Sequence, residues 1–247
     1  MAKKKIVEKT VESKKALSDS PYLPYLFIFL VVLSLFLFYT AYDKTSKSLV
    51  FENLIKVLAF QNSTKSFSEI NKVFALSAIG LIAISFILGP LARFWPDIFV
   101  KYLYFRKPVG LAGFVLGVIH GIYSAIAFYN LDITSMLVNN EKSLAIIFGI
   151  IGTIVFIIMS ATSNKTMLDK LGYKIWKAIQ TFGYFGLLFI VLHFLLIETK
   201  PDKGFDVRPY GLVFFYIAVA ALVLRVIAIF VKSEPKTKYE HHFGSEK

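Results

Sequence analysis

The chain has 247 residues, of which 56% are hydrophobic and 16% aromatic, and its formal net charge is +12 at pH 7. The long apolar blocks exclude an ordinary soluble domain, and in a membrane protein excess Lys and Arg indicate topology and contact with anionic lipid rather than nucleic-acid binding. Cysteine is absent, which excludes disulfides, thiolate-ligated haem and cysteine-ligated iron–sulfur clusters and leaves four histidines as the main soft-metal ligands.

The apolar runs predict an all-α, polytopic membrane protein with a bundle of six transmembrane helices. Residues 1–21 are predicted to form a disordered basic tail, 22–232 the six-helix domain and 233–247 a second polar tail. An amphipathic piece inside the polar loop 43–69 is expected to lie on the membrane surface. The predicted spans are 23–42, 72–92, 108–130, 143–162, 173–197 and 210–231.

The distribution of basic residues predicts how the bundle is oriented. If the N-terminus is inside, the inner segments hold 18 Lys or Arg and the outer loops hold 9. Because short cytoplasmic loops carry the excess of positive charge, both termini are predicted to be cytoplasmic.

The third span carries one histidine in an otherwise uncharged run. His120 follows Gly113 by seven residues and Gly117 by three, so the three share one helix face. An ionisable group at membrane depth is costly and is a functional candidate. Because two of its residues are glycines, this face could contact a flat, bulky group that the imidazole binds. The alternative is a GxxxG-like face that packs against another helix.

The fifth span carries the second membrane histidine. His193 follows Gly186 by seven residues on the same face. Two neutral imidazoles facing each other across a bundle make a good haem site, although each could instead serve a proton relay or a helix–helix hydrogen bond. Counted from the inner helix ends at about 1.5 Å per residue, His193 is expected about 10 Å farther out than His120. His241 and His242 fall in the charged tail and are expected to be solvated.

The third span carries Arg106-Lys107, Gly110-Leu111, Phe114 and His120. Between the fourth and fifth spans stand Thr162-Ser163, Leu171-Gly172, Trp176 and Tyr184, followed by His193, by the loop with Lys200, Asp202, Pro209 and Tyr210, and by Arg225. The second span adds weaker matches at Ala75-Leu76 and Gly89-Pro90-Leu91. The resemblance that these residues carry covers 73–230 and is to the ferric reductase-like transmembrane superfamily, and within it to the haem-binding membrane subunits of periplasmic methionine sulfoxide reductase systems. It implies that His120 and His193 are the two axial ligands of a haem iron, and that Gly113, Gly117 and Gly186 are small residues facing the haem.

One position departs from the family pattern. Gln180 stands thirteen residues before His193, where the family has a histidine that serves a haem site at a second depth. Glutamine offers only a neutral amide and is a poor iron ligand. The sequence therefore predicts one bis-histidine b-type haem.

The implied function is electron transfer across the bacterial inner membrane as a subunit of an oxidoreductase system; whether the chain is itself an enzyme stays open. No G-x-G-x-x-G follows a strand pattern, so electrons are expected from quinol or a separate flavin reductase, with a bound quinone or flavin as a candidate second cofactor. The expected acceptor is an extracytoplasmic redox partner, besides contact with membrane lipid. The alternative is a cofactor-free integral membrane protein, transporter-like or an assembly factor, in which both histidines are structural.

Basic residues outside the histidine pair allow two interpretations. Arg106, Lys107 and Arg225 are expected to anchor helix ends at the inner surface, with contact to an anionic cofactor group, a quinone or a haem propionate as the alternative. The outer loop could pair with haem propionates or dock an acidic partner, or it could simply be solvated, and its basic residues are Lys200, Lys203 and Arg208.

Overall fold

The computed structural model describes residues 20–43, 46–59, 61, 63–202, 204–207 and 209–231. Nearly all of the predicted tail 1–21 and the whole of 233–247 lie outside the described residues, as do four residues named above: Lys203, Arg208, His241 and His242.

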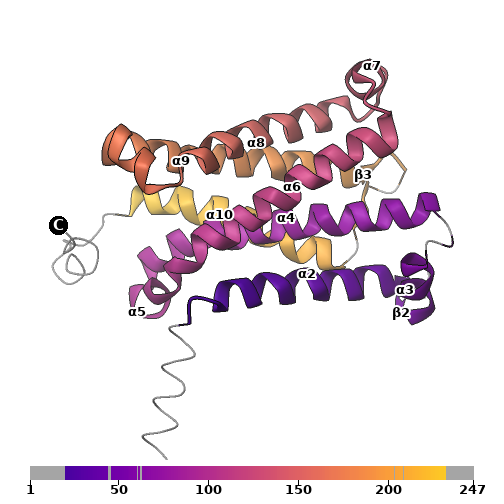
Figure 1. Cartoon of the computed structure of the whole chain (residues 1–247), viewed down its shortest axis with the longest axis horizontal. Helices are drawn as coiled ribbons and strands as arrows, with labels where there is room; N and C mark the ends of the chain where they lie inside the picture. The colour runs from indigo at the N-terminus through magenta and orange to yellow at the C-terminus, as the bar shows by residue number, and fades with distance from the viewer. Residues whose placement is uncertain are drawn as a thin grey trace, which may run out of the picture.

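Six helices of the described chain are long and apolar enough to cross a membrane, which confirms the predicted all-α, six-span architecture (Figure 1). At about 1.5 Å per residue, 20 helical residues match a hydrocarbon core of about 30 Å. The six are α2 (Leu23–Ala41), α4 (Ser63–Phe94), α6 (Arg106–Tyr129), α8 (Ser143–Ala161), α9 (Lys165–Glu198) and α10 (Pro209–Phe230).

Local signals explain where several of these helices begin and end. Pro24 stands in the first turn of α2, where its missing N–H costs nothing. Asn130 closes α6 in the left-handed conformation, with φ of 49°. Asn164 starts α9 by accepting a hydrogen bond from the Met167 N–H at 2.9 Å. Gly172 interrupts α9 with φ of 72°, which a glycine adopts without steric cost.

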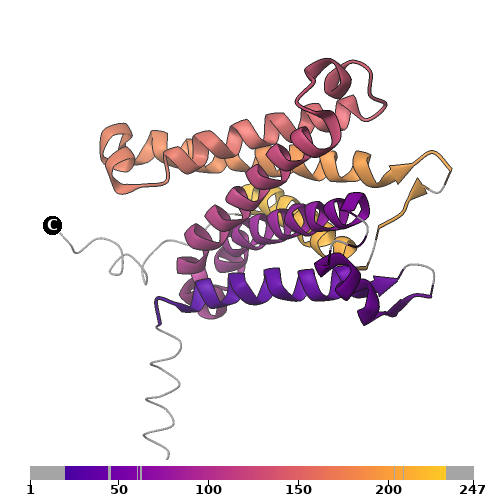
Figure 2. The ribbon, with the colours of Figure 1, turned by 45° about the vertical axis from the view of Figure 1, so that its right-hand side comes forward.

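Short elements join the spans. At one end of the bundle, α5 (Pro96–Phe99) and the 3-10 helix η1 (Val100–Phe105) link α4 to α6. At the other end lie α3 (Phe51–Leu58), α7 (Ile133–Leu137) and two antiparallel hairpins (Figures 1 and 2). The hairpin strands are β1 (Tyr42–Asp43) with β2 (Ser48–Leu49), and β3 (Thr199–Lys200) with β4 (Gly204–Phe205). These two ends are called the α5 end and the α7 end below.

The amphipathic piece predicted in the first loop does form a helix, α3. Its exposed apolar residues Phe51, Ile55 and Leu58 share one face, while Lys56 pairs with Glu52 beside them. Its position on a membrane surface stays a prediction.

The helix α4 is the centre of the bundle. It packs against α6, α10 and α2, and α8 packs against α9. Leu81 and Ala83 of α4 are fully buried, whereas the other five spans keep many large apolar side chains on the outside, as helices facing lipid do. The described chain starts and ends at the α5 end (Figure 1), as an even number of spans requires. The cytoplasmic location of that end remains a prediction.

Candidate functional site

The two membrane histidines meet inside the bundle, near the α7 end. The ring centroids of His120 on α6 and His193 on α9 are 6.3 Å apart, and the ring planes are inclined by 69°. Both side chains are half-buried. The expected 10 Å offset along the membrane normal is wrong, because the inner ends of the helices are not level. The α8–α9 turn extends beyond the start of α6 at the α5 end (Figures 1 and 2).

Hydrogen bonds orient both imidazoles in the same way. The Nδ1 atom of His193 lies 2.8 Å from the backbone oxygen of Ala145, which can only accept, so Nδ1 carries the proton. The Nδ1 atom of His120 lies 3.0 Å from Oδ1 of Asn71, whose amide nitrogen donates to Ser124 Oγ at 2.8 Å. In a neutral imidazole held this way, Nε2 keeps the lone pair. Metal-binding histidines are arranged in this manner, with the far ring nitrogen donating to a fixed oxygen.

Gly149 makes room for the His193 ring, and the sequence pattern did not single it out. A Cβ at this position would lie 2.8 Å from His193 Nδ1 and 3.2 Å from Cε1. Ala145 and Gly149 are one turn apart on α8, so the histidine lies over a strip of small residues. The spacing of Ala145 and Gly149 can be seen in the sequence. It does not reveal which side chain packs there, because His193 lies on another helix.

Asn71 is the second residue that sequence reasoning missed. It is buried on α4 and supports His120 across the α4–α6 interface. An amide just before the apolar run 72–92 was a detectable signal, because a buried polar side chain needs a partner.

The pair suits a metal inside a flat organic group better than a cage made of protein ligands alone. Within the described residues, no group of three or more His, Cys, Asp or Glu is placed to hold a metal ion. Two opposed imidazoles that each bind one metal through Nε2 at about 2.0–2.1 Å would have ring centroids about 6–6.5 Å apart. The observed 6.3 Å falls within that range. A porphyrin supplies the four remaining nitrogens, so the residues present fit a haem.

The glycines predicted to face the haem are placed at helix crossings. A Cβ on Gly113 would lie 2.9 Å from the backbone nitrogen of Ile82, and one on Gly117 would lie 3.6 Å from Ala78, both on α4. A Cβ on Gly186 would lie 2.9 Å from Val155 on α8. These contacts correspond to the alternative stated for the third span, a GxxxG-like face at which small residues let two helix backbones approach each other.

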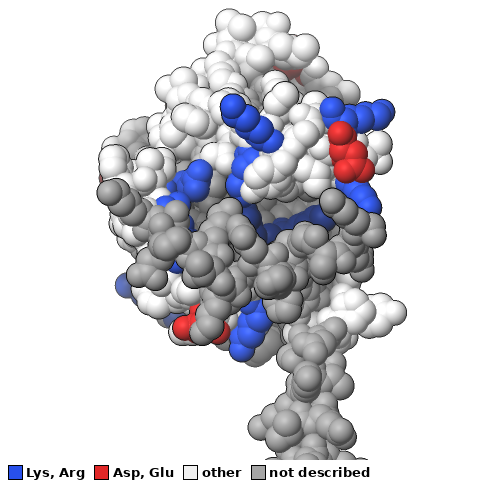
Figure 3. All heavy atoms as spheres, turned by 90° about the vertical axis from the view of Figure 1, so that its left-hand side faces the viewer, with Lys and Arg blue, Asp and Glu red and all other residues white. Residues whose placement is uncertain are grey.

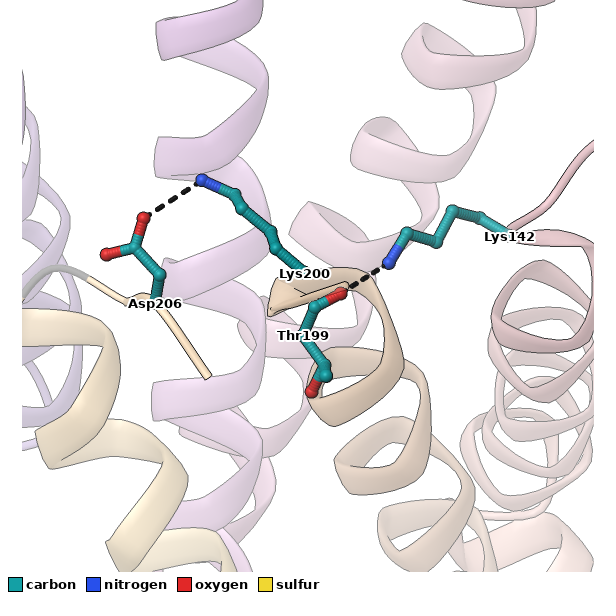
Figure 4. A network of polar contacts seen from close by, with 4 residues as sticks. All are labelled: Lys142, Thr199, Lys200 and Asp206. Carbon is teal, nitrogen blue, oxygen red and sulfur yellow. Dashed lines mark hydrogen bonds and ion pairs between the residues drawn. The ribbon is translucent and has the colours of Figure 1, made fainter. Parts of the chain in front are cut away.

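A lysine ties α8 to the last turn of α9, close to His193. The Nζ atom of Lys142 donates to the backbone oxygen of Leu196 at 2.8 Å. It also donates to the backbone oxygen of Thr199 at 2.6 Å (Figure 4). A cation at a helix C-terminus satisfies carbonyls that have no partner within the helix. The neighbouring Lys200 forms an exposed ion pair with Asp206 at 2.9 Å, and this hydrogen bond raises the pKa of Lys200.

At the α5 end, Gln180 occupies the place where the family pattern has a second histidine. Its amide nitrogen donates to the Met159 backbone oxygen at 3.2 Å and to Thr162 Oγ1 at 3.3 Å. Trp176, one turn earlier on α9, donates from its indole to the Thr162 backbone oxygen at 2.9 Å. These contacts use both side chains to join α9 to α8.

Comparison with known proteins supports the resemblance drawn from the sequence. Residues 74–191 match the model of the ferric reductase like transmembrane component. A 148-residue stretch, 59% of this chain, is 28% identical to the protein-methionine-sulfoxide reductase heme-binding subunit MsrQ of Agrobacterium fabrum. The match spans 65% of that relative's length. Both findings support the predicted resemblance to the ferric reductase-like family.

Proposed function

We propose that this ferric reductase-like membrane protein is a haem-binding electron-transfer subunit of the bacterial inner membrane, with His120 and His193 as the two axial ligands of one b-type haem. The observation that carries the proposal is the geometry of the pair: ring centroids 6.3 Å apart and both Nδ1 atoms directed at oxygen acceptors. The Agrobacterium relative supports it, since that protein is named a heme-binding subunit. Haem supplies a reversible one-electron couple between ferric and ferrous iron.

The chain's own residues would hold and tune this group. Asn71 and Ala145 keep the imidazoles in the tautomer that presents Nε2, and Gly149 leaves space for the ring of His193. Both histidines belong to long helices that are fixed by packing on α4 and α8. Rigid placement of the ligands favours electron transfer, because little reorganisation accompanies the change of charge.

The position of the pair bears on the donor and the acceptor. His120 lies nine residues before the end of α6, about 14 Å from the α7 end, and fourteen residues after its start, about 21 Å from the α5 end. If the α5 end is cytoplasmic, the pair lies nearer the outer surface, and the acceptor is an extracytoplasmic redox partner. Quinol, or the flavin of a separate reductase, then donates from the α5 side.

An optical spectrum of the detergent-purified protein tests the ligand assignment, oxidised and then dithionite-reduced, with a pyridine haemochrome count. We expect a low-spin b-type spectrum at one haem per chain, and its loss in His120→Ala and in His193→Ala. His241→Ala in the tail is the control and should keep the wild-type spectrum. A six-coordinate spectrum that survives either membrane-histidine variant refutes the assignment. Absence of haem from the wild-type protein, even after reconstitution, favours a cofactor-free protein with structural histidines.

A further inference from the structure

A second polar site lies at the α5 end, away from the histidine pair. Arg106 on α6, Tyr184 on α9 and Gly89 on α4 converge there. A Cβ on Gly89 would lie 3.4 Å from the Arg106 guanidinium and 3.5 Å from the Tyr184 hydroxyl. Arg225 on α10 places its guanidinium carbon 5.2 Å from the centroid of the Tyr184 ring. Four helices therefore contribute to one cluster, and the guanidinium of Arg106 and the hydroxyl of Tyr184 both lie beside the backbone of Gly89.

The polar atoms of the cluster are held by the backbone. Arg106 Nε donates to the Ser85 backbone oxygen at 3.1 Å, and Ser85 Oγ donates to the Arg106 backbone oxygen at 2.7 Å. The Tyr184 hydroxyl donates to the Phe86 backbone oxygen at 3.0 Å. The Nε contact fixes the plane of the Arg106 guanidinium, while its terminal nitrogens donate to no acceptor in the part of the chain that the structure describes.

The charges of this cluster are all positive. Arg106 and Lys177 each experience repulsion from Arg225, and Lys177 is also repelled by Arg106. Among the residues that the structure describes, no carboxylate contributes to the surroundings of Arg106 or Lys177. Figure 3 looks onto this end and shows Lys and Arg around and within a hollow of the surface. Lys177 is exposed, but Arg106 and Arg225 are half-buried, and half-buried like charges are costly unless an anion joins them.

We propose that this cluster binds the phosphate of an anionic phospholipid headgroup. Guanidinium groups match the oxygens of a phosphate, and basic recesses between transmembrane helices bind anionic headgroups. Arg106 is the first residue of α6 and Arg225 lies five residues before the end of α10, so the cluster lies at the depth of headgroups. Exposed Val226 and Ile229 of α10 offer the acyl chains an apolar surface nearby. This combination favours a lipid over a soluble phosphate. The site does not depend on haem.

Native mass spectrometry of the purified full chain, titrated with dioleoylphosphatidylglycerol or dioleoylphosphatidylcholine, tests the proposal. We expect one phosphatidylglycerol to bind in preference to phosphatidylcholine. Loss of one cation near a headgroup removes about fivefold in affinity, so Arg225→Gln should weaken phosphatidylglycerol binding by about that factor. Within the described part of the chain the Arg225 side chain makes no hydrogen bond, so this variant should fold. Lys177→Gln should act in the same direction.

Matched variants remove the same charge from exposed neighbours. Lys107→Gln is adjacent to Arg106, and Lys174→Gln lies one turn before Lys177; both should retain wild-type binding. Equal binding of the two lipids, or an effect of Arg225→Gln no larger than that of Lys107→Gln, overturns the proposal. Inorganic phosphate at millimolar concentration is the third probe. If it binds in an Arg225-dependent manner while phosphatidylglycerol does not, the occupant is a soluble phosphate and the lipid assignment is wrong.

Discussion

Replacing Gly149 with alanine is expected to disturb His193 without touching the histidine itself. The added methyl would lie 2.8 Å from Nδ1 and 3.2 Å from Cε1 of the ring. Ordinary contacts of this kind are about 3.5–4.0 Å, so the ring must retreat by about 0.7 Å or more. That movement takes Nδ1 away from the Ala145 oxygen, which now accepts its hydrogen bond at 2.8 Å.

Two opposing terms decide the size of the effect on folding. Overpacking costs about 1–3 kcal/mol, whereas alanine in place of glycine inside a helix gains about 0.5–1 kcal/mol. The net loss in the free energy of unfolding is therefore anywhere from about 0 to 2.5 kcal/mol, so haem affinity is the better quantity to measure. Loss of the hydrogen-bond partner behind a metal-binding histidine lowers metal affinity about 10–100-fold, so Gly149→Ala should lower haem affinity by a similar factor.

Spectrophotometric titration of the haem-free protein with hemin measures this affinity. Gly121→Ala is the matched control, because Gly121 adjoins His120 and a Cβ there would meet nothing within 4 Å. The control should bind haem as the wild-type protein does. If Gly149→Ala matches Gly121→Ala in both affinity and spectrum, the placement of the His193 ring against α8 is refuted.

Three further variants test other parts of the structure. Asn71→Leu removes the acceptor behind the α6 histidine and should lower haem affinity about 10–100-fold in the same titration. Ser124→Ala removes only the hydroxyl that accepts from the Asn71 amide and should give a smaller loss. Gln180→His should leave the pyridine haemochrome count at one, because the described residues contain no histidine besides His120 and His193 that could act as the second axial ligand of another haem. A count of two would contradict the single-haem prediction. Lys142→Met removes the cation at the C-terminus of α9 and should lower the free energy of unfolding, measured by thermal denaturation, by about 1.5–3 kcal/mol. Lys200→Met removes an exposed ion pair and should change the free energy of unfolding little. Equal effects of the two variants would refute the capping role of Lys142.

The six spans were predictable from apolar runs alone, because a helix must satisfy its own backbone in lipid. The predicted ends are close except at two N-termini. Spans predicted to start at 72 and 173 begin at Ser63 in α4 and Lys165 in α9. Polar residues continue a helix beyond the hydrocarbon, where a local signal such as the Asn164 cap sets the start and hydropathy does not.

The candidate ligands were also identifiable, since a histidine at membrane depth is expensive and therefore informative. The depths of the two histidines in the membrane could not be predicted from the sequence. Counting residues from helix ends assumes that all helices begin at one level, and the 6.3 Å between the rings of His120 and His193 shows that they do not. The assignment of these two residues as haem ligands remains a prediction until haem is measured.

The sequence by itself determined the number of spans, the pair of membrane histidines and the glutamine that departs from the family pattern, because each is a property of one residue or one helix. Only the tertiary structure decided which side chains meet. It placed Gly113 and Gly186 at helix crossings, set Asn71 and Gly149 behind the imidazoles, and brought Arg106 and Arg225 to the same tyrosine. Such contacts join helices far apart in the chain, and helix rotation, tilt and level are set by packing against neighbours, which no single segment's periodicity contains.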